Sequence, residues 1–267
     1  MAANAEKGGK DWSAVQYLKF EEQRTRPSRD LLAQVGLSSP QRVVDVGCGP
    51  GNSTEILVRR YPGASIVGID SSPNLIEKAK KTLPEVDFSV SDLQTYKATE
   101  SLDLIFSNAV LQWVKSEDRI PAIKRLMESL KSGGVLAMQV PDNFGENSHV
   151  LMREVAKSGP WAKKLQELNP SHGKFQAPQE LYDALIPHCS SVDIWHTIYQ
   201  HPLDSHSSIV EWFKGTALKS YVDPLPSEQQ EEFLAAYLAR LKEEYPVSAD
   251  GKVLLHFPRL FMVATKS

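Results

Sequence analysis

Short apolar runs alternate with amphipathic segments over the first half of the chain. The amphipathic segments, for example Pro73–Leu83 and Glu117–Lys131, place apolar residues at helical spacing. The apolar runs are rich in β-branched residues, which favour buried strands; they are Val43–Val46, Ala64–Asp70, Val86–Val90, Leu102–Phe106 and Val135–Val140. Strands and helices that alternate with short links predict a parallel, doubly wound α/β sheet.

The pattern changes after Glu146, where helical segments outnumber strands. We expect a sixth strand at Val192–Tyr199 and a seventh at Val253–Ala264, which would return antiparallel as an edge partner of the sixth. Helices are predicted near residues 149–155, 179–185, 207–218 and 227–245, with a loop-rich insertion at 158–177. These extra helices are expected to form a cap over the carboxyl end of the sheet, where ligands of such folds bind.

The N-terminal segment has its own pattern. Residues 1–10 are polar and are expected to be disordered, whereas Asp11–Leu32 is expected to be helical, with Pro27 separating two segments. A cluster of aromatic residues and arginines here, which includes Tyr17, Arg24 and Arg26, is either an amphipathic cover helix or a lid over a ligand pocket. We therefore expect one domain over residues 11–267, made of a lid (11–35), a core (36–145), a helical cap with strand six (146–250) and a final strand (251–267).

A glycine motif follows the first predicted strand. The glycines stand at alternate positions: Gly47, Gly49 and Gly51. Glycine allows positive φ and lets a ligand approach the backbone closely. Asn52 or Ser53 is expected to cap the helix that follows. A strand, a glycine turn and a helix form the first unit of a nucleotide-binding α/β domain.

Two acids accompany this motif. Asp70 ends the next predicted strand, 19 residues after Gly51, at the spacing where an acid binds ribose hydroxyls. Asp45 precedes the first glycine by two residues, and its charge suits a cationic ligand better than the diphosphate of a nicotinamide cofactor. The motif resembles motif I of the class I S-adenosylmethionine methyltransferases. The alternative is a glycine turn that binds no ligand.

This resemblance implies which residues would bind S-adenosylmethionine, with S-adenosylhomocysteine as the product. Asp92 would accept a hydrogen bond from the adenine amino group, or else it is a helix cap or loop acid. Gln112 and Trp113 would lie near the transferred methyl group, the alternative for Trp113 being a core aromatic. The residues expected around the donor are Tyr17, Asp45, Gly47, Gly49, Gly51, Asn52, Asp70, Ser71, Asp92, Leu93 and Asn108, with Ser107 beside them.

Composition is that of an ordinary soluble globular protein. Of the 267 residues, 41% are hydrophobic and 24% charged, and the net charge of −3 with no Lys/Arg block does not favour nucleic acid. No apolar run approaches the ~20 residues that span a bilayer, and the N-terminus has no apolar signal-peptide core. The two cysteines, Cys48 and Cys189, have no metal-ligand neighbours at zinc spacing and are expected to be reduced thiols in a cytoplasmic protein.

Several stretches resemble one subfamily, the trans-aconitate 2-methyltransferases. The match runs nearly end to end, except for the tail before Asp11 and the insertion at 158–177. The most specific pieces are Arg24-x-Arg26-Pro27, Leu111-Gln112-Trp113 and Phe257-Pro258-Arg259-Leu260-Phe261. The others include Tyr17-Leu18-x-Phe20, Gly47–Thr54, Gly68–Pro73, Leu102–Phe106, Pro141-Asp142-Asn143, His149–Val155 and Val192–Trp195.

The resemblance implies a class I methyltransferase fold, with a seven-stranded, mostly parallel sheet whose strand seven is antiparallel, and methyl transfer to a carboxylate of trans-aconitate. Because carboxylic acids have pKa values near ~4 and are ionised at neutral pH, the reaction needs no general base. Binding a triacid in a protein of negative net charge requires arginines, which hold carboxylates through paired hydrogen bonds. The candidates are Arg26, Arg153 and Arg259, with His149 and Trp113 beside them; each arginine has the alternative of a surface ion pair.

Other functions remain open from the residues alone. The acceptor could be a hydroxyl or an amine of another small molecule, or the protein could bind the donor without turnover. A nicotinamide dehydrogenase is disfavoured by the glycine spacing and Asp45. Nothing in the sequence indicates an obligate protein partner or a metal site.

Overall fold

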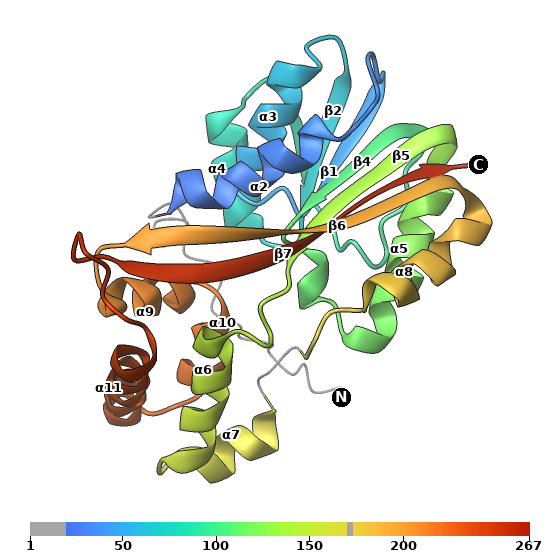
Figure 1. The fold of residues 1–267 in the computed structure, drawn as a ribbon. Coiled ribbons are helices and arrows are strands. Elements are labelled where there is room, and N and C mark those ends of the chain that lie inside the picture. The colour runs from blue at the N-terminus through green and yellow to red at the C-terminus, as the bar shows by residue number, and fades with distance from the viewer. Residues whose placement is uncertain (1–19, 170–172) are drawn as a thin grey trace, which may run out of the picture.

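The computed structural model describes residues 20–169 and 173–267, and seven strands in this part of the chain form one sheet. The strand order is β3-β2-β1-β4-β5-β7-β6 (Figure 1). Strands β1 to β5 pair in parallel, and β7 runs antiparallel to both of its neighbours, β5 and β6. The strands are β1 Arg42–Val46, β2 Ser65–Asp70, β3 Asp87–Val90, β4 Leu102–Asn108, β5 Leu130–Pro141, β6 Cys189–Leu203 and β7 Val253–Lys266.

The predicted fold class is thereby confirmed, with one difference in the placement of the last strand. Strand β7 is not at an edge: it lies between β5 and β6, so that β6 forms the edge of the sheet. The interior position of β7 and the edge position of β6 agree with the composition of the two strands. β7 is almost continuously apolar and buried, whereas β6 alternates exposed and partly buried positions, which suits a strand paired on only one side.

Helices cover both faces of the sheet (Figure 1). Leu31 and Leu32 of α2 and Leu57 of α3 pack on one face, while Leu126 of α5 and Leu181 of α8 pack on the other. The helices are α2 Glu21–Ala33, α3 Asn52–Arg60, α4 Pro73–Thr82, α5 Ser116–Glu128, α6 Asn147–Ser158, α7 Ala162–Leu168, α8 Pro178–Leu185, α9 His206–Lys214, α10 Ala217–Val222 and α11 Ser227–Glu244, with 3-10 turns η1 Leu111–Trp113 and η2 Ile186–His188.

A cap of helices packs on the β6–β7 part of the sheet. Helices α6, α7, α9, α10 and α11 gather beside the long β6–β7 ribbon (Figure 1). Met152 of α6, Phe213 of α9 and Phe233 of α11 are buried in one cluster with Phe257 of β7. The cap and the end of the sheet where the site described below lies thus share one apolar core.

Local details correct three sequence-based expectations. Pro27 lies inside the single helix α2 rather than between two segments. The N-cap of α3 is Gly51, with φ of 100°, and neither Asn52 nor Ser53 caps this helix. The insertion at 158–177 contains a helix, α7. The expected cap of α4 is present, since the Ser72 hydroxyl accepts a hydrogen bond from the Leu75 N–H and Pro73 begins the helix.

Membrane-spanning helices and metal-binding clusters are both absent from residues 20–169 and 173–267. No helix there is both long enough and apolar enough to cross a bilayer. No group of three histidine, cysteine or acidic side chains is arranged there to hold a metal ion. Cys48 and Cys189 are both buried and free.

Candidate active site

The glycine motif forms a tight loop at the carboxyl end of β1. The N–H groups of Gly47 and Cys48 both donate to the carbonyl oxygen of Ile69 on β2, at 2.7 and 2.9 Å. Gly47 and Gly49 have φ of 70° and 56°, a region that side chains disfavour. A Cβ on Gly47 would stand 2.2 Å from the Val110 side chain. The loop therefore requires glycine for both conformation and space.

A cavity of about 440 Å³ opens beside this loop, and we call it the glycine-loop cavity. Asp70 lies at its edge, and its two oxygens accept hydrogen bonds from the backbone N–H of Gly49 at 3.0 Å and of Ser72 at 2.9 Å. Asp92 also lines the cavity, and one of its oxygens accepts from the Gln94 N–H. The predicted residues that line it are Gly47, Gly49, Asp70, Ser71, Asp92, Leu93, Asn108 and Trp113.

Other predicted donor residues lie elsewhere. Asp45 is fully buried beneath the loop, where the hydroxyls of Ser53 and Thr54 donate to one oxygen at 2.7 and 2.6 Å. Burial raises the pKa of Asp45 to about 6, although these hydroxyl groups oppose the rise. Asp45 thus ties α3 to β1 rather than lining the cavity.

Gly51, Asn52 and Ser107 are likewise outside the glycine-loop cavity. Gly51 caps α3, and Ser107 is buried in the sheet. Tyr17 lies outside the described residues, so its expected contact with the donor stays a prediction.

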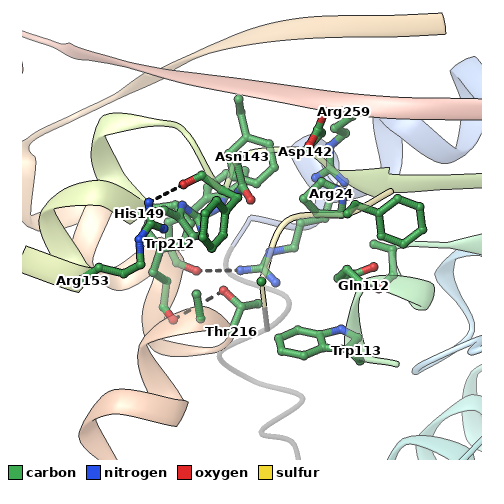
Figure 2. A pocket seen from close by; sticks show the side chains of 18 of the residues that line it. Arg24, Gln112, Trp113, Asp142, Asn143, His149, Arg153, Trp212, Thr216 and Arg259 are labelled. Carbon is green, nitrogen blue, oxygen red and sulfur yellow. Dashed lines mark hydrogen bonds between the residues drawn. The ribbon is translucent and has the colours of Figure 1, made fainter. Parts of the chain in front are cut away.

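A second cavity, of about 170 Å³, lies between the sheet and the cap (Figure 2), and we call it the arginine cavity. Arg24 from α2, Arg153 from α6 and Arg259 from β7 all line it. Figure 2 shows these three side chains around the cavity together with Gln112, Trp113 and His149. Aromatic side chains, including Trp212 and Phe257, supply much of the remaining wall.

Neighbouring groups hold each arginine of this cavity. The Arg259 side chain is 4% exposed; it donates to Gln139 Oε1 at 3.1 Å and lies over the Phe257 ring. Arg24 donates to the Trp212 carbonyl at 3.0 Å, and Arg153 donates to the Phe144 carbonyl at 2.7 Å. These contacts hold the side chains in place, and each guanidinium carries five N–H donors, the kind of group that binds an anion.

Arg26, predicted to bind substrate, is not in the arginine cavity. Its guanidinium is exposed, 3.7 Å from Asp30, and lies over the Tyr199 ring. Arg24, in the same sequence motif, takes the inward position instead. The helical period explains this, since Arg24 shares the buried stripe of α2 with Pro27, Ser28, Leu31 and Leu32. Reading that stripe from the sequence would have selected Arg24 and rejected Arg26.

A histidine and an acid, His149 and Asp142, also line the arginine cavity. Desolvation, with a further contribution from the positive charge of Arg153, lowers the pKa of His149 to about 3, so its ring is neutral at physiological pH. The ring meets Phe213 edge-on. Asp142 is the acid in the cavity wall, and His196 Nε2 lies 2.9 Å from its Oδ2.

The two cavities meet at Ala109, Trp113 and Thr216, which line both. Ala109 has φ of 59°, an unusual value for a residue with a side chain. Gln112 Nε2 donates to the Ala109 carbonyl at 2.6 Å. Arg119, a buried residue that sequence reasoning missed, donates to the carbonyls of Gln112 and Val114 at 3.2 and 2.9 Å. The segment 109–114, which separates the two cavities, is therefore held by hydrogen bonds from the side chains of Gln112 and Arg119.

Comparison with known proteins identifies the family. Trans-aconitate 2-methyltransferase from Rhodopseudomonas palustris (strain BisA53) is 51% identical over 256 residues, which cover 96% of this chain and 99% of the relative. The chain belongs to the trans-aconitate 2-methyltransferase family. The model of a methyltransferase domain matches residues 43–134, which contain the glycine loop and the strands that form the glycine-loop cavity.

Solved structures agree with this family assignment at the level of the fold. The YcgJ protein from Bacillus subtilis has a TM-score of 0.58 at 14% identity, covering 90% of this chain and 98% of its own. A phosphoethanolamine N-methyltransferase from Haemonchus contortus, solved with S-adenosylhomocysteine, has a TM-score of 0.52 at 15% identity, covering 91% of this chain and 53% of its own. As a member of the trans-aconitate 2-methyltransferase family, the protein is a methyltransferase whose methyl donor is S-adenosylmethionine.

Proposed function

We propose that this enzyme transfers the methyl group of S-adenosylmethionine to a carboxylate of trans-aconitate and forms the monomethyl ester. One observation carries the proposal: Arg24, Arg153 and Arg259 converge on one cavity that adjoins the glycine-loop cavity. The relative from Rhodopseudomonas palustris is named a trans-aconitate 2-methyltransferase, which supports trans-aconitate as the acid. A tricarboxylate offers three negative charges to these guanidinium groups, each able to form paired hydrogen bonds, and Arg119 lines the same cavity.

The glycine-loop cavity suits the donor. The positive-φ glycines leave the backbone uncovered beside the cavity, and Asp70 and Asp92 retain acceptor capacity, because each carboxylate oxygen has two lone pairs. Asp70 would bind ribose hydroxyls, and Asp92 with Leu93 would contact the adenine. S-adenosylmethionine supplies an electrophilic methyl carbon on a positively charged sulfur. These residues would hold it so that this carbon faces the arginine cavity through the junction at Ala109.

The chain does not need to move a proton in this reaction. A carboxylate with a pKa near ~4 is already a nucleophile at neutral pH, and His149, whose pKa is about 3, is neutral there. When the carboxylate oxygen takes the methyl group, the carbon–sulfur bond breaks and its electron pair stays on sulfur. The contribution of the enzyme is then the placement of the two reactants, which can lower a barrier by roughly 7–11 kcal/mol. Gln112 and Trp113 at the junction are the orienting residues.

The test is a radiolabelled methyl-transfer screen over small di- and tricarboxylic acids, with hydroxyl and amine compounds included, and with the ester position read by NMR. We expect trans-aconitate to be the best acceptor. We also expect kcat/KM to be constant between pH 6 and 8, because a reacting carboxylate with a pKa near ~4 is ionised across this range. Transfer confined to amines or phenols, with a rate that rises through this range, would replace the proposal with methylation of a different acceptor.

Arginine variants test the site itself. Arg259→Lys and Arg24→Lys should raise the KM for trans-aconitate by about 10- to 100-fold, as expected for the loss of a charged hydrogen bond worth roughly 1.5–3 kcal/mol. Donor affinity should stay within about twofold for Arg259→Lys, because Arg259 does not line the glycine-loop cavity. Arg26→Lys, on the same helix as Arg24 but outside the arginine cavity, is the matched control. If Arg24→Lys and Arg26→Lys raised the KM for trans-aconitate equally, the assignment of the arginine cavity as the acid site would be contradicted.

A further inference from the structure

Gln139 is a buried polar residue on β5 that lines neither cavity. Its side chain joins two residues that do. Gln139 Nε2 donates to Asn108 Oδ1 on β4, and Gln139 Oε1 accepts from Arg259 Nη1 on β7 at 3.1 Å. Asn108 lines the glycine-loop cavity and Arg259 lines the arginine cavity. A single side chain therefore connects the two cavities through the sheet.

The sheet register brings these three residues together. Gln139 pairs with Asn108 on one side and with Phe261 on the other, and Arg259 lies two residues from Phe261 on the same face. Residues two apart on a strand share a face, and diagonal neighbours on adjacent strands are within reach of long side chains. Flanking side chains on that face of β5, Val135 and Ala137, are apolar and buried. An amide at position 139 is costly to bury unless both of its polar atoms are paired.

The charge of Arg259 determines the orientation of both amides. A guanidinium can only donate hydrogen bonds, so Gln139 must turn its oxygen toward Arg259. Its nitrogen then faces Asn108 and requires an acceptor, so Asn108 must present its oxygen to Gln139. The amide nitrogen of Asn108 is thereby directed away from Gln139. Because Arg259 can only donate, it fixes the orientation of the Gln139 amide and, through it, that of Asn108, which lines the glycine-loop cavity.

We propose that Gln139 is a positioning residue that orients Arg259 for the acid and Asn108 for the donor, and so couples the two binding sites. For the acid, this rests on the function proposed above. Gln139 touches neither ligand site and acts only through its two neighbours. A substitution at this one position should therefore affect the binding of both ligands, whereas Arg259→Lys should affect the acid and Asn108→Ala the donor.

The experiment measures the KM for trans-aconitate and the Kd for S-adenosylhomocysteine in Gln139→Leu, Arg259→Lys, Asn108→Ala and the double variants. Gln139→Leu should raise both constants by about 5- to 10-fold, as expected when a hydrogen-bond partner is lost on each side. In Gln139→Leu/Arg259→Lys, the KM should be no higher than in Arg259→Lys, because residues that act through one another are not additive. Met138→Leu, a buried neighbour that faces the opposite side of β5, is the control and should leave both constants unchanged.

Two results would overturn the proposal: either constant staying within twofold of the parent value in Gln139→Leu, or additive effects in the double variants. An unchanged KM for trans-aconitate in Arg259→Lys would instead contradict the acid site of the proposed function. The Kd for S-adenosylhomocysteine in Gln139→Leu would then still test whether Gln139 orients Asn108. If Gln139→Leu fails to fold, Gln139→Glu decides the matter. Its carboxylate would pair with Arg259 and offset the charge, so the KM for trans-aconitate should rise above the parent value by at least the 5- to 10-fold expected for Gln139→Leu, with the donor constant altered through Asn108.

Discussion

Asp70 accepts a hydrogen bond from the backbone N–H of Gly49, at 3.0 Å, across the mouth of the glycine-loop cavity. The strand-end acid and the glycine loop are thus one structural unit, rather than two separate contacts to a ligand. The second oxygen of Asp70 accepts from the Ser72 N–H and so links the same unit to the start of α4.

Removing this acid should affect both the loop and the donor. Asp70→Ala is expected to weaken binding of S-adenosylhomocysteine by roughly 1–3 kcal/mol, because buried N–H groups lose their acceptor and the ribose loses its partner. Isothermal titration calorimetry measures this change. Asp87→Ala, which removes an exposed acid from β3, is the control and should leave the affinity unchanged. Unaltered affinity in Asp70→Ala would show that the acid does not contact the donor.

Gly47 should tolerate no side chain. In Gly47→Ala the new methyl group would stand 2.2 Å from the Val110 side chain, on a backbone with φ of 70°. Overpacking and the left-handed conformation together should lower the free energy of unfolding by about 2–5 kcal/mol, measured by urea denaturation.

A second substitution separates these two causes. Gly47→Ala/Val110→Ala should recover part of the lost stability, because the two closest clashes, with the Val110 methyl groups at 2.2 and 2.6 Å, are removed, while the 2.9 Å approach to the Val110 Cβ and the conformational strain remain. Gly63→Ala is the control, since a Cβ at that position meets nothing within 4 Å. If the double variant is no more stable than Gly47→Ala, contact with Val110 is not the reason that position 47 requires glycine.

Partly buried His149 should make the apoenzyme less stable in mild acid. Its pKa is about 3 in the folded protein and near 6.5 in the unfolded chain, so between these values the unfolded state binds more protons. Stability therefore falls as the pH decreases below about 6.5, by at most about 1.4 kcal/mol per pH unit from this residue.

Urea denaturation at pH 7 and pH 5 tests this dependence. His149→Gln should lose less stability between these two pH values than the parent protein, because its side chain does not titrate. His188→Gln, a change at an exposed histidine, should retain the parent dependence. Identical losses in the parent and in His149→Gln would mean that His149 can accept its proton in the folded state.

Much of the fold could be predicted because its signals are local. Strands β1, β2, β4 and β5 contain runs of β-branched or aliphatic residues, and Ser72 with Pro73 marks the start of α4 by its own capping chemistry. Most of the glycine-loop cavity could be predicted for the same reason, since the residues that line it follow the ends of successive strands. Asp45 lies outside that cavity, as do Gly51 and Asn52. For Asp45, a charge near the loop does not reveal whether the side chain points at the ligand or beneath it.

The arginine cavity could be predicted only in part. The sequence alone determined the strands, the glycine loop, the strand-end acid and the family resemblance, because each depends on residues close together in the chain. Only the tertiary structure decided that Arg24 rather than Arg26 faces the cavity, that β7 inserts between β5 and β6, and that Gln139 links Asn108 to Arg259. These relationships join residues on separate strands and helices, 31 positions apart for Gln139 and Asn108 and 120 for Gln139 and Arg259. Their geometry is set by which surfaces pack together, a property that no local pattern encodes.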